Sequence, residues 1–250
     1  TGFHGVSVAI PFLLGAIYVF EKMYKLNNFN TKSLVIFWIL LILTMAGKEE
    51  LPLLIVIFGL FVWIYRNKMK LGLSMIVVGT IWFCLAFFVI IPRYAHYRIE
   101  GYQKFAQELN IDTSLTNDVA KSNYFLSRYE GFGESYSEVI KGMIANPRRV
   151  ARVFFGGDKL ENLTMTFTPV LYFPLLFPPI LAIAFPEFLI NFLTTQGGIG
   201  TSEIFNHRIS IIIPILFLAS IYGIGWVSRF ISRYLKIKRN VVLLILCLLF

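Results

Sequence analysis

The feature that most constrains this chain is a series of long stretches without a single Asp, Glu, Lys or Arg. There are eight, each 11 to 25 residues long: 1–20, 33–47, 51–65, 71–92, 162–186, 188–202, 209–228 and 240–250. A helix needs about 20 apolar residues to cross a hydrocarbon core roughly 30 Å thick. The sequence therefore predicts a polytopic membrane protein and excludes most classes of soluble enzyme. We do not expect 188–202 to span, because its second half is polar and Gly-rich.

Composition agrees with a membrane protein. Charged residues make up 15% of the chain, whereas a soluble domain has about 25%. Cys84 and Cys247 lie in apolar stretches without a metal-binding or redox spacing, so packing explains them better. The net charge of +9 could indicate nucleic acid as a partner. Its distribution argues otherwise, and we expect no nucleic acid.

Three short loops carry 11 cations and a single acid, Glu21. The cations are Lys22, Lys25, Lys32, Arg66, Lys68, Lys70, Arg229, Arg233, Lys236, Lys238 and Arg239. An excess of Lys and Arg in short loops marks the cytoplasmic side of a membrane protein. The segment 93–161 holds 10 Lys or Arg and 9 Asp or Glu. We therefore place this nearly neutral segment outside.

These assignments predict an all-α, polytopic transmembrane helix bundle with one mainly helical extracytoplasmic insertion. Its expected parts are four transmembrane segments within 1–92 (about 5–20, 33–47, 51–65 and 71–92), the insertion 93–161, a membrane segment 162–193, an outer loop 194–208, and two transmembrane segments within 209–250, the last truncated. The segment 162–193 has to begin and end outside, either as a re-entrant hairpin or as two short helices. Its five prolines favour a broken path, which at membrane depth needs surrounding protein or a water-filled cavity.

Both ends of the chain fall within apolar stretches. The chain starts at Thr1 and stops at Phe250. We therefore expect a fragment that lacks the N-terminal part of a longer protein.

The first candidate functional residues are Lys48, Glu49 and Glu50, between two 15-residue stretches. A 15-residue helix is about 22 Å long, so we expect this tip to lie below the outer membrane surface. Charges at that depth usually face a cavity and mark a substrate path. The alternative is a short hairpin whose Lys48 reaches the headgroups.

Other outer-face residues could join the same site. His4 begins the first segment, and His207 and Arg208 precede 209–228. Arg and Lys are the usual clamps for phosphate, so these positions could line a phosphate site around Lys48. The alternative is that each is a polar anchor at a helix end.

The last candidates are Arg128, Tyr129 and Glu130 in the insertion. Arg128 could bind an anionic group and Glu130 could act as a base or an orienting group. Alternatively, an Arg–Glu pair merely orders the loop. The sequence contains no P-loop, GxGxxG, HExxH or Cys/His ligand cluster.

Several motifs, in order along the chain, resemble one family. They are Phe3-His4 followed by VAIPFLLGAIYVF, the turn Lys48-Glu49-Glu50, Arg128-Tyr129 through Gly133 to Ser135, the run FPLLFPPILAIAFPEFLINFLTT, and His207 followed by IIIPILFLASIYGI. This set resembles the domain of unknown function 2079, a family of bacterial and archaeal membrane proteins. Gly5-Val6 stands where the family has Pro-Glu, and Arg208 where an aromatic is common.

The resemblance implies a GT-C-like glycosyltransferase of the plasma membrane, which takes sugar from a polyprenyl-phosphate donor on the outer face. It also implies an acidic base upstream of Thr1. Such transfer needs a cationic clamp for the leaving phosphate, and we predict that Lys48, Arg128 and Arg208 form it and that Glu49 or Glu130 orients. The sequence identifies no cofactor and no metal ligands, and a divalent cation stays an open alternative. Two other functions also stay open: a transporter or lipid-handling protein, and a membrane scaffold with an external docking domain.

Overall fold

The computed structural model describes residues 4–108, 126–195, 202–203 and 207–249. Within those ranges the chain forms helices and no strand, so the prediction of an all-α protein is confirmed. The longer helices are α1 (Gly5–Lys25), α2 (Thr31–Met45), α3 (Leu51–Leu60), α4 (Met69–Cys84), α5 (Ile91–Glu108), α7 (Tyr136–Ala145), α8 (Pro147–Phe155), α9 (Lys159–Phe167), α11 (Phe185–Phe192), α12 (Ile212–Leu235) and α13 (Arg239–Leu249).

Three helices are long and apolar enough to cross a membrane: Gly5–Lys25, Met69–Tyr94 and Ile212–Leu235. They correspond to the segments predicted at 5–20, 71–92 and 209–228. The apolar helices Thr31–Met45 and Leu51–Tyr65 are shorter. The helix Leu51–Tyr65 ends in a π-helical turn, Phe61–Tyr65 (η1).

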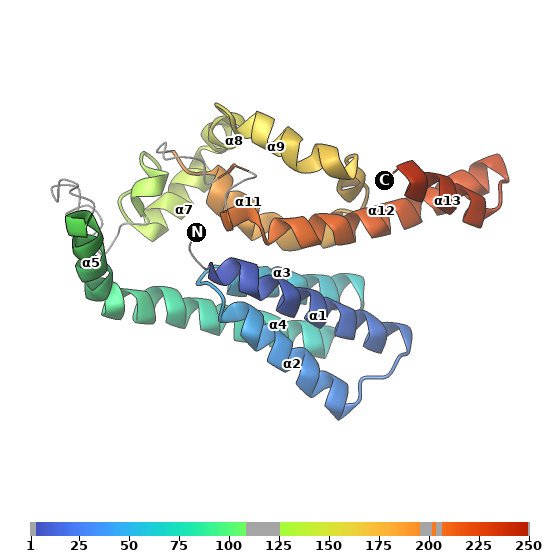
Figure 1. Ribbon diagram of the computed structural model, residues 1–250, viewed down its shortest axis with the longest axis horizontal. Coiled ribbons are helices and arrows are strands. Elements are labelled where there is room, and N and C mark those ends of the chain that lie inside the picture. Colours follow the sequence, from blue (N-terminus) through green and yellow to red (C-terminus); the bar gives the residue numbers. More distant parts are fainter. Residues whose placement is uncertain (1–3, 109–125, 196–201, 204–206, 250) are drawn as a thin grey trace.

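The first four helices pack into a bundle around aromatic side chains (Figure 1). The Phe20 and Phe58 rings meet edge to face with centroids 5.7 Å apart, and Phe37 lies 6.1 Å from Phe20. Such pairs stabilise a core beyond the area they bury. Small residues let α3 and α4 approach closely: a Cβ on Gly72 would come within 2.6 Å of the Gly59 carbonyl oxygen.

The C-terminal half shares its core with this bundle. One cluster of buried residues runs from α1, α2 and α3 into α11 and α12. Arg66 also ties the halves together, because it donates to Glu21 at 2.6 Å and to the Tyr222 hydroxyl at 2.8 Å. The α1–α4 bundle is therefore held against α12 rather than standing apart from it.

The segment after α8 folds back on itself. α9 runs toward the end with the basic loops, the chain reverses at Leu171 and Tyr172, which both have positive φ, and short helical turns lead back to α11 (Figure 1). The Lys159 ammonium closes this hairpin by donating to the carbonyls of Phe192 at 2.7 Å and Thr194 at 2.6 Å. The beginning of α9 is thus fastened to the end of α11.

The two ends of the molecule differ in charge. The three basic loops, which are 26–30, 66–68 and 236–238 together with the Lys and Arg residues of the adjoining helix turns, lie toward one end, on the right in Figure 1. The N-terminus, the α2–α3 turn, α7 and the end of α11 lie toward the other. This arrangement is the one that the positive-inside rule requires of a protein whose candidate site faces outward.

The insertion is helical where the structure describes it. α7 and α8 surround a small core of Leu126, Phe132 and Val139. The Ser135 hydroxyl caps α7 by accepting from the backbone N–H of Glu138 at 3.3 Å, as a capping box predicts. Residues 109–125 lie outside the described ranges.

Candidate functional site

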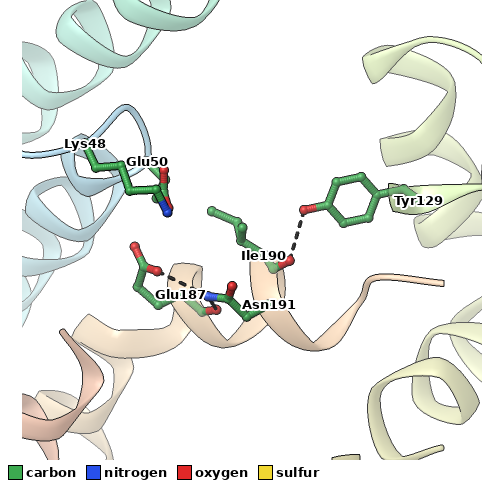
Figure 2. A network of polar contacts seen from close by, with 6 residues as sticks. All are labelled: Lys48, Glu50, Tyr129, Glu187, Ile190 and Asn191. Carbon is green, nitrogen blue, oxygen red and sulfur yellow. Dashed lines mark hydrogen bonds and ion pairs between the residues drawn. The ribbon is translucent and has the colours of Figure 1, made fainter. Parts of the chain in front are cut away.

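The candidate site is the junction between the α2–α3 turn and α11, at the end opposite the basic loops. Glu50 ends the turn and is 7% exposed, and Glu187 in α11 is 1% exposed. Figure 2 shows the Glu187 carboxylate pointing toward the Lys48 ammonium and the Glu50 carboxylate. Two buried acids and one half-buried cation are therefore gathered at this junction.

Close packing against α1 fixes the position of the turn. A Cβ on Gly47 would come within 2.8 Å of the Ala9 Cβ and 2.9 Å of the Gly5 carbonyl oxygen. Only glycine fits between those atoms without a shift. This contact places Lys48 and Glu50 over the bundle rather than in the surrounding lipid.

Lys48 forms an ion pair with Glu50, and the two side chains are 22% and 9% exposed. The acid that contacts Lys48 is thus Glu50, whereas the sequence predicted an orienting role for Glu49 or Glu130. The reason is local geometry, because Glu50 is the N-cap residue of α3 and is buried under the turn, whereas Glu49 is only half-buried. A buried ion pair is strongly destabilised when one partner is removed.

Glu187 lies in the first turn of α11, after Pro186 at the helix start. The helix dipole favours an acid at this position, and Asn191 one turn later donates to the Glu187 carbonyl at 2.9 Å and to Oε2 at 3.4 Å. Oε1 is buried and has no hydrogen-bond partner among the described residues. Glu187 also interacts electrostatically with Glu50 and Lys48.

Tyr129 of the insertion contacts α11 beside the junction. Its hydroxyl donates to the backbone carbonyl of Ile190 at 3.1 Å. Burial raises the pKa of Tyr129 to about 12, so this hydroxyl stays protonated and keeps donating. The contact joins the insertion to α11, next to Glu187 and Asn191 (Figure 2).

Comparison with known proteins was made for the whole chain. Residues 1–250 match the model of a family described as "Predicted membrane protein (DUF2079)". The chain belongs to this family. No curated protein and no solved structure matches it. The predicted family resemblance is therefore confirmed, and the family's description supports a membrane protein in contact with lipid.

The other residues of the Arg128–Glu130 motif of this DUF2079 protein dock through their backbone. Thr195 donates its N–H to the Arg128 carbonyl at 2.7 Å and its hydroxyl to the Glu130 carbonyl at 2.9 Å. The Arg128 side chain is half-buried and that of Glu130 is exposed. The motif thus fastens the insertion to the residues after α11, and the Tyr129 side chain fastens it to α11 itself.

The remaining sequence candidates lie around the same end. His4 precedes α1, and its carbonyl accepts from the N–H of Ser7 at 3.0 Å. Arg208 is half-buried in a short helical turn, His207–Ile209 (η8), that packs against α1 and α11. The side chain of His207 lies outside the described part. No group of three or more His, Cys, Asp or Glu side chains in the described part could hold a metal ion.

Sequence reasoning missed Glu187 and Asn191. The signal for Glu187 was present, because it is the single charged residue between Glu161 and Glu203 and interrupts two charge-free stretches. An ionisable residue inside such a segment is by default a candidate functional residue. Asn191 gives no comparable signal in the sequence, and only its position one helical turn after Glu187 identifies it.

Proposed function

We propose that this DUF2079 protein is a multi-pass glycosyltransferase of the plasma membrane, which transfers sugar from a polyprenyl-phosphate donor at the outer face. The observation that carries the proposal is the buried meeting of Lys48, Glu50 and Glu187 at the end opposite the basic loops. Acids and cations at such a depth are expensive and are typically retained for function. The resemblance of this family to GT-C glycosyltransferases supports the same function.

The depth of the site fits a lipid-linked donor. α2 has 15 residues, a length of about 22 Å, against a hydrocarbon core of roughly 30 Å. The turn that carries Lys48 would therefore lie below the outer surface of the bilayer. A phosphate attached to a membrane-embedded chain can reach this level, whereas a soluble sugar nucleotide would have to leave water.

In the proposed reaction, Lys48 and Glu187 have separate roles. The bond between the anomeric carbon of the sugar and the phosphate oxygen breaks, and the acceptor oxygen bonds to that carbon. The Lys48 ammonium stabilises the negative charge that develops on the departing polyprenyl phosphate. Glu187 Oε1, which has no partner among the described residues, accepts a hydrogen bond from the acceptor hydroxyl and takes its proton. Glu187 thus takes the role that the family resemblance gives to an acid upstream of Thr1.

The test uses membranes that contain the protein and a panel of radiolabelled polyprenyl-phosphate sugars. We expect label in a product with wild-type protein, partial transfer with Lys48→Arg, and none with Lys48→Gln. Lys141→Gln removes an exposed lysine on α7 and should leave transfer unchanged. Turnover by Lys48→Gln at the wild-type rate would remove Lys48 from the site.

A second comparison separates chemistry from folding. Lys48→Gln alone leaves Glu50 buried without its partner, which costs up to about 3 kcal/mol of unfolding free energy. The double variant Lys48→Gln/Glu50→Gln removes both charges and should recover that stability. We expect it to fold like wild type and still fail to transfer sugar.

A transporter or lipid-handling protein is the second candidate. The buried Oε1 of Glu187, which has no partner in the described part of the chain, favours it, because intramembrane acids also serve in proton-coupled transport. Saturable binding of lipid phosphate without turnover of any donor in the panel would support this candidate and contradict the transferase.

A further inference from the structure

An open apolar groove lies within the hairpin formed by α9 and α11, apart from Lys48 and Glu187. Its lining is almost entirely hydrocarbon and includes Phe154, Phe155, Leu160, Leu163, Phe167 and Phe188. Its volume is about 520 Å³, within the range of roughly 300–1,000 Å³ for small-molecule sites. The polar atoms that such a site needs to orient a sugar or nucleotide are scarce here, so the lining fits a hydrocarbon chain.

One end of the groove is bounded by α8 and by the Lys159 contacts that close the hairpin. Phe154 and Phe155 at the end of α8 form part of the lining. The Lys159 ammonium holds the start of α9 to the end of α11, and it also donates to the Val153 carbonyl at 2.9 Å. Three carbonyl acceptors occupy this ammonium, so it serves to close the groove rather than to bind a ligand.

A stripe of cations on α8 leads into the groove. Arg148, Arg152 and Phe155 are spaced four and three residues apart, so they lie along one face of the helix. All three side chains are exposed. Arg149 lies on another face and stacks over the Phe132 ring at 4.9 Å. The exposed stripe is about 10 Å long and ends at a residue that lines the groove.

We propose that the groove and this stripe together bind a bilayer phospholipid with an anionic headgroup. One acyl chain lies in the groove between α9 and α11, and the phosphate lies against Arg148 and Arg152. Basic helices with an apolar face bind anionic lipids at the membrane interface in this way. The acids Asp158 and Glu161 are also exposed nearby and would repel an anionic headgroup. The attraction for the phosphate therefore comes from Arg148 and Arg152 on α8.

This lipid site does not depend on sugar transfer. It would hold a structural lipid that seats the hairpin and α8 in the outer leaflet, beside the acidic junction. Its occupant is a diacyl phospholipid rather than the proposed isoprenoid donor. Binding can therefore be measured whether or not the protein turns over any donor.

The test is photo-crosslinking in phosphatidylcholine vesicles that contain the full chain and a small fraction of phosphatidylglycerol. The phosphatidylglycerol carries a diazirine near the end of one acyl chain, and labelled peptides are mapped by mass spectrometry. We expect label in α9 and α11 that excess unlabelled phosphatidylglycerol removes. Arg148→Gln and Arg152→Gln should each lower this label about fivefold, the share of one cation at an anionic surface.

Two further variants make the test specific. Arg229→Gln/Arg233→Gln removes two cations at the far end of α12 and should leave the groove label unchanged. Leu160→Trp fills the groove from its exposed side, because Leu160 is 56% exposed, and should abolish the label with both arginines intact. Equal labelling by a phosphatidylcholine probe, label spread evenly over lipid-facing helices, or label only from a polyprenyl-phosphate probe would each overturn the proposal.

Discussion

Glu187 provides the most informative single substitution. The side chain is 1% exposed, and Oε1 has no hydrogen-bond partner among the described residues. Oε2 receives one long contact from Asn191 at 3.4 Å, and the Glu50 carboxylate adds repulsion. Glu187→Gln keeps the shape of the side chain, removes its acidic group and adds an N–H₂ group that can donate to Glu50.

The expected gain follows from these contacts. A buried polar atom without a partner costs about 1–3 kcal/mol, and the long contact to Asn191 recovers little of it. We therefore expect Glu187→Gln to raise the free energy of unfolding by about 1–2 kcal/mol. For a chain of this size that corresponds to a rise in Tm of about 2–8 °C.

The assay is thermal unfolding of the purified protein in one detergent, with wild type and Glu187→Gln measured side by side. Glu161→Gln is the matched control, because Glu161 is exposed on α9, and exposed substitutions change stability by about 0.5 kcal/mol or less. A fall in Tm for Glu187→Gln would mean that the carboxylate is a satisfied structural group. That result would refute the reasoning that the charge is retained for function.

Two other substitutions test how the site is assembled. Gly47→Ala should lower the free energy of unfolding by about 1–3 kcal/mol, because the new Cβ overpacks Ala9 and Gly5. Gly101→Ala is the control in the same thermal melts, because a Cβ at Gly101 meets open space. Equal Tm values for the two variants would contradict the close packing at Gly47. Tyr129→Phe should cost about 0.5–1.5 kcal/mol through loss of the bond to Ile190. Faster proteolysis of the insertion should accompany it, and unchanged proteolysis would show that other contacts, such as those of Thr195 and Lys159, hold the insertion without it.

Much of the membrane part of the fold could be predicted from charge alone. The charge-free stretches 1–20, 71–92 and 209–228 correspond to the three long helices, because a helix in lipid must be apolar throughout its length. The sequence did not predict that the helix over 71–92 continues beyond Pro92 as far as Glu108. A π-helical stretch, Leu85–Ile90 (η2), comes directly before the helix turn that holds this proline. Its altered hydrogen-bond pattern lets the helix continue although proline has no backbone N–H to donate.

The site was harder to predict than the fold. Lys48 was identified from a local pattern, three charges between two apolar stretches. Its neighbour Glu187 is 139 residues further along the chain, and only the folding of α11 against α3 brings them together. The sequence also could not show that Lys48 pairs with Glu50 rather than with Glu49, because this depends on which side of a tight turn is buried.

The most direct test of the central claim is sugar transfer by Glu187→Gln in membranes, at equal amounts of folded protein and with the donor that wild type uses. The account predicts that transfer is lost while the protein is at least as stable as wild type. Transfer at the wild-type rate by this folded variant would contradict the claim that the buried junction of Lys48, Glu50 and Glu187 is where the protein works.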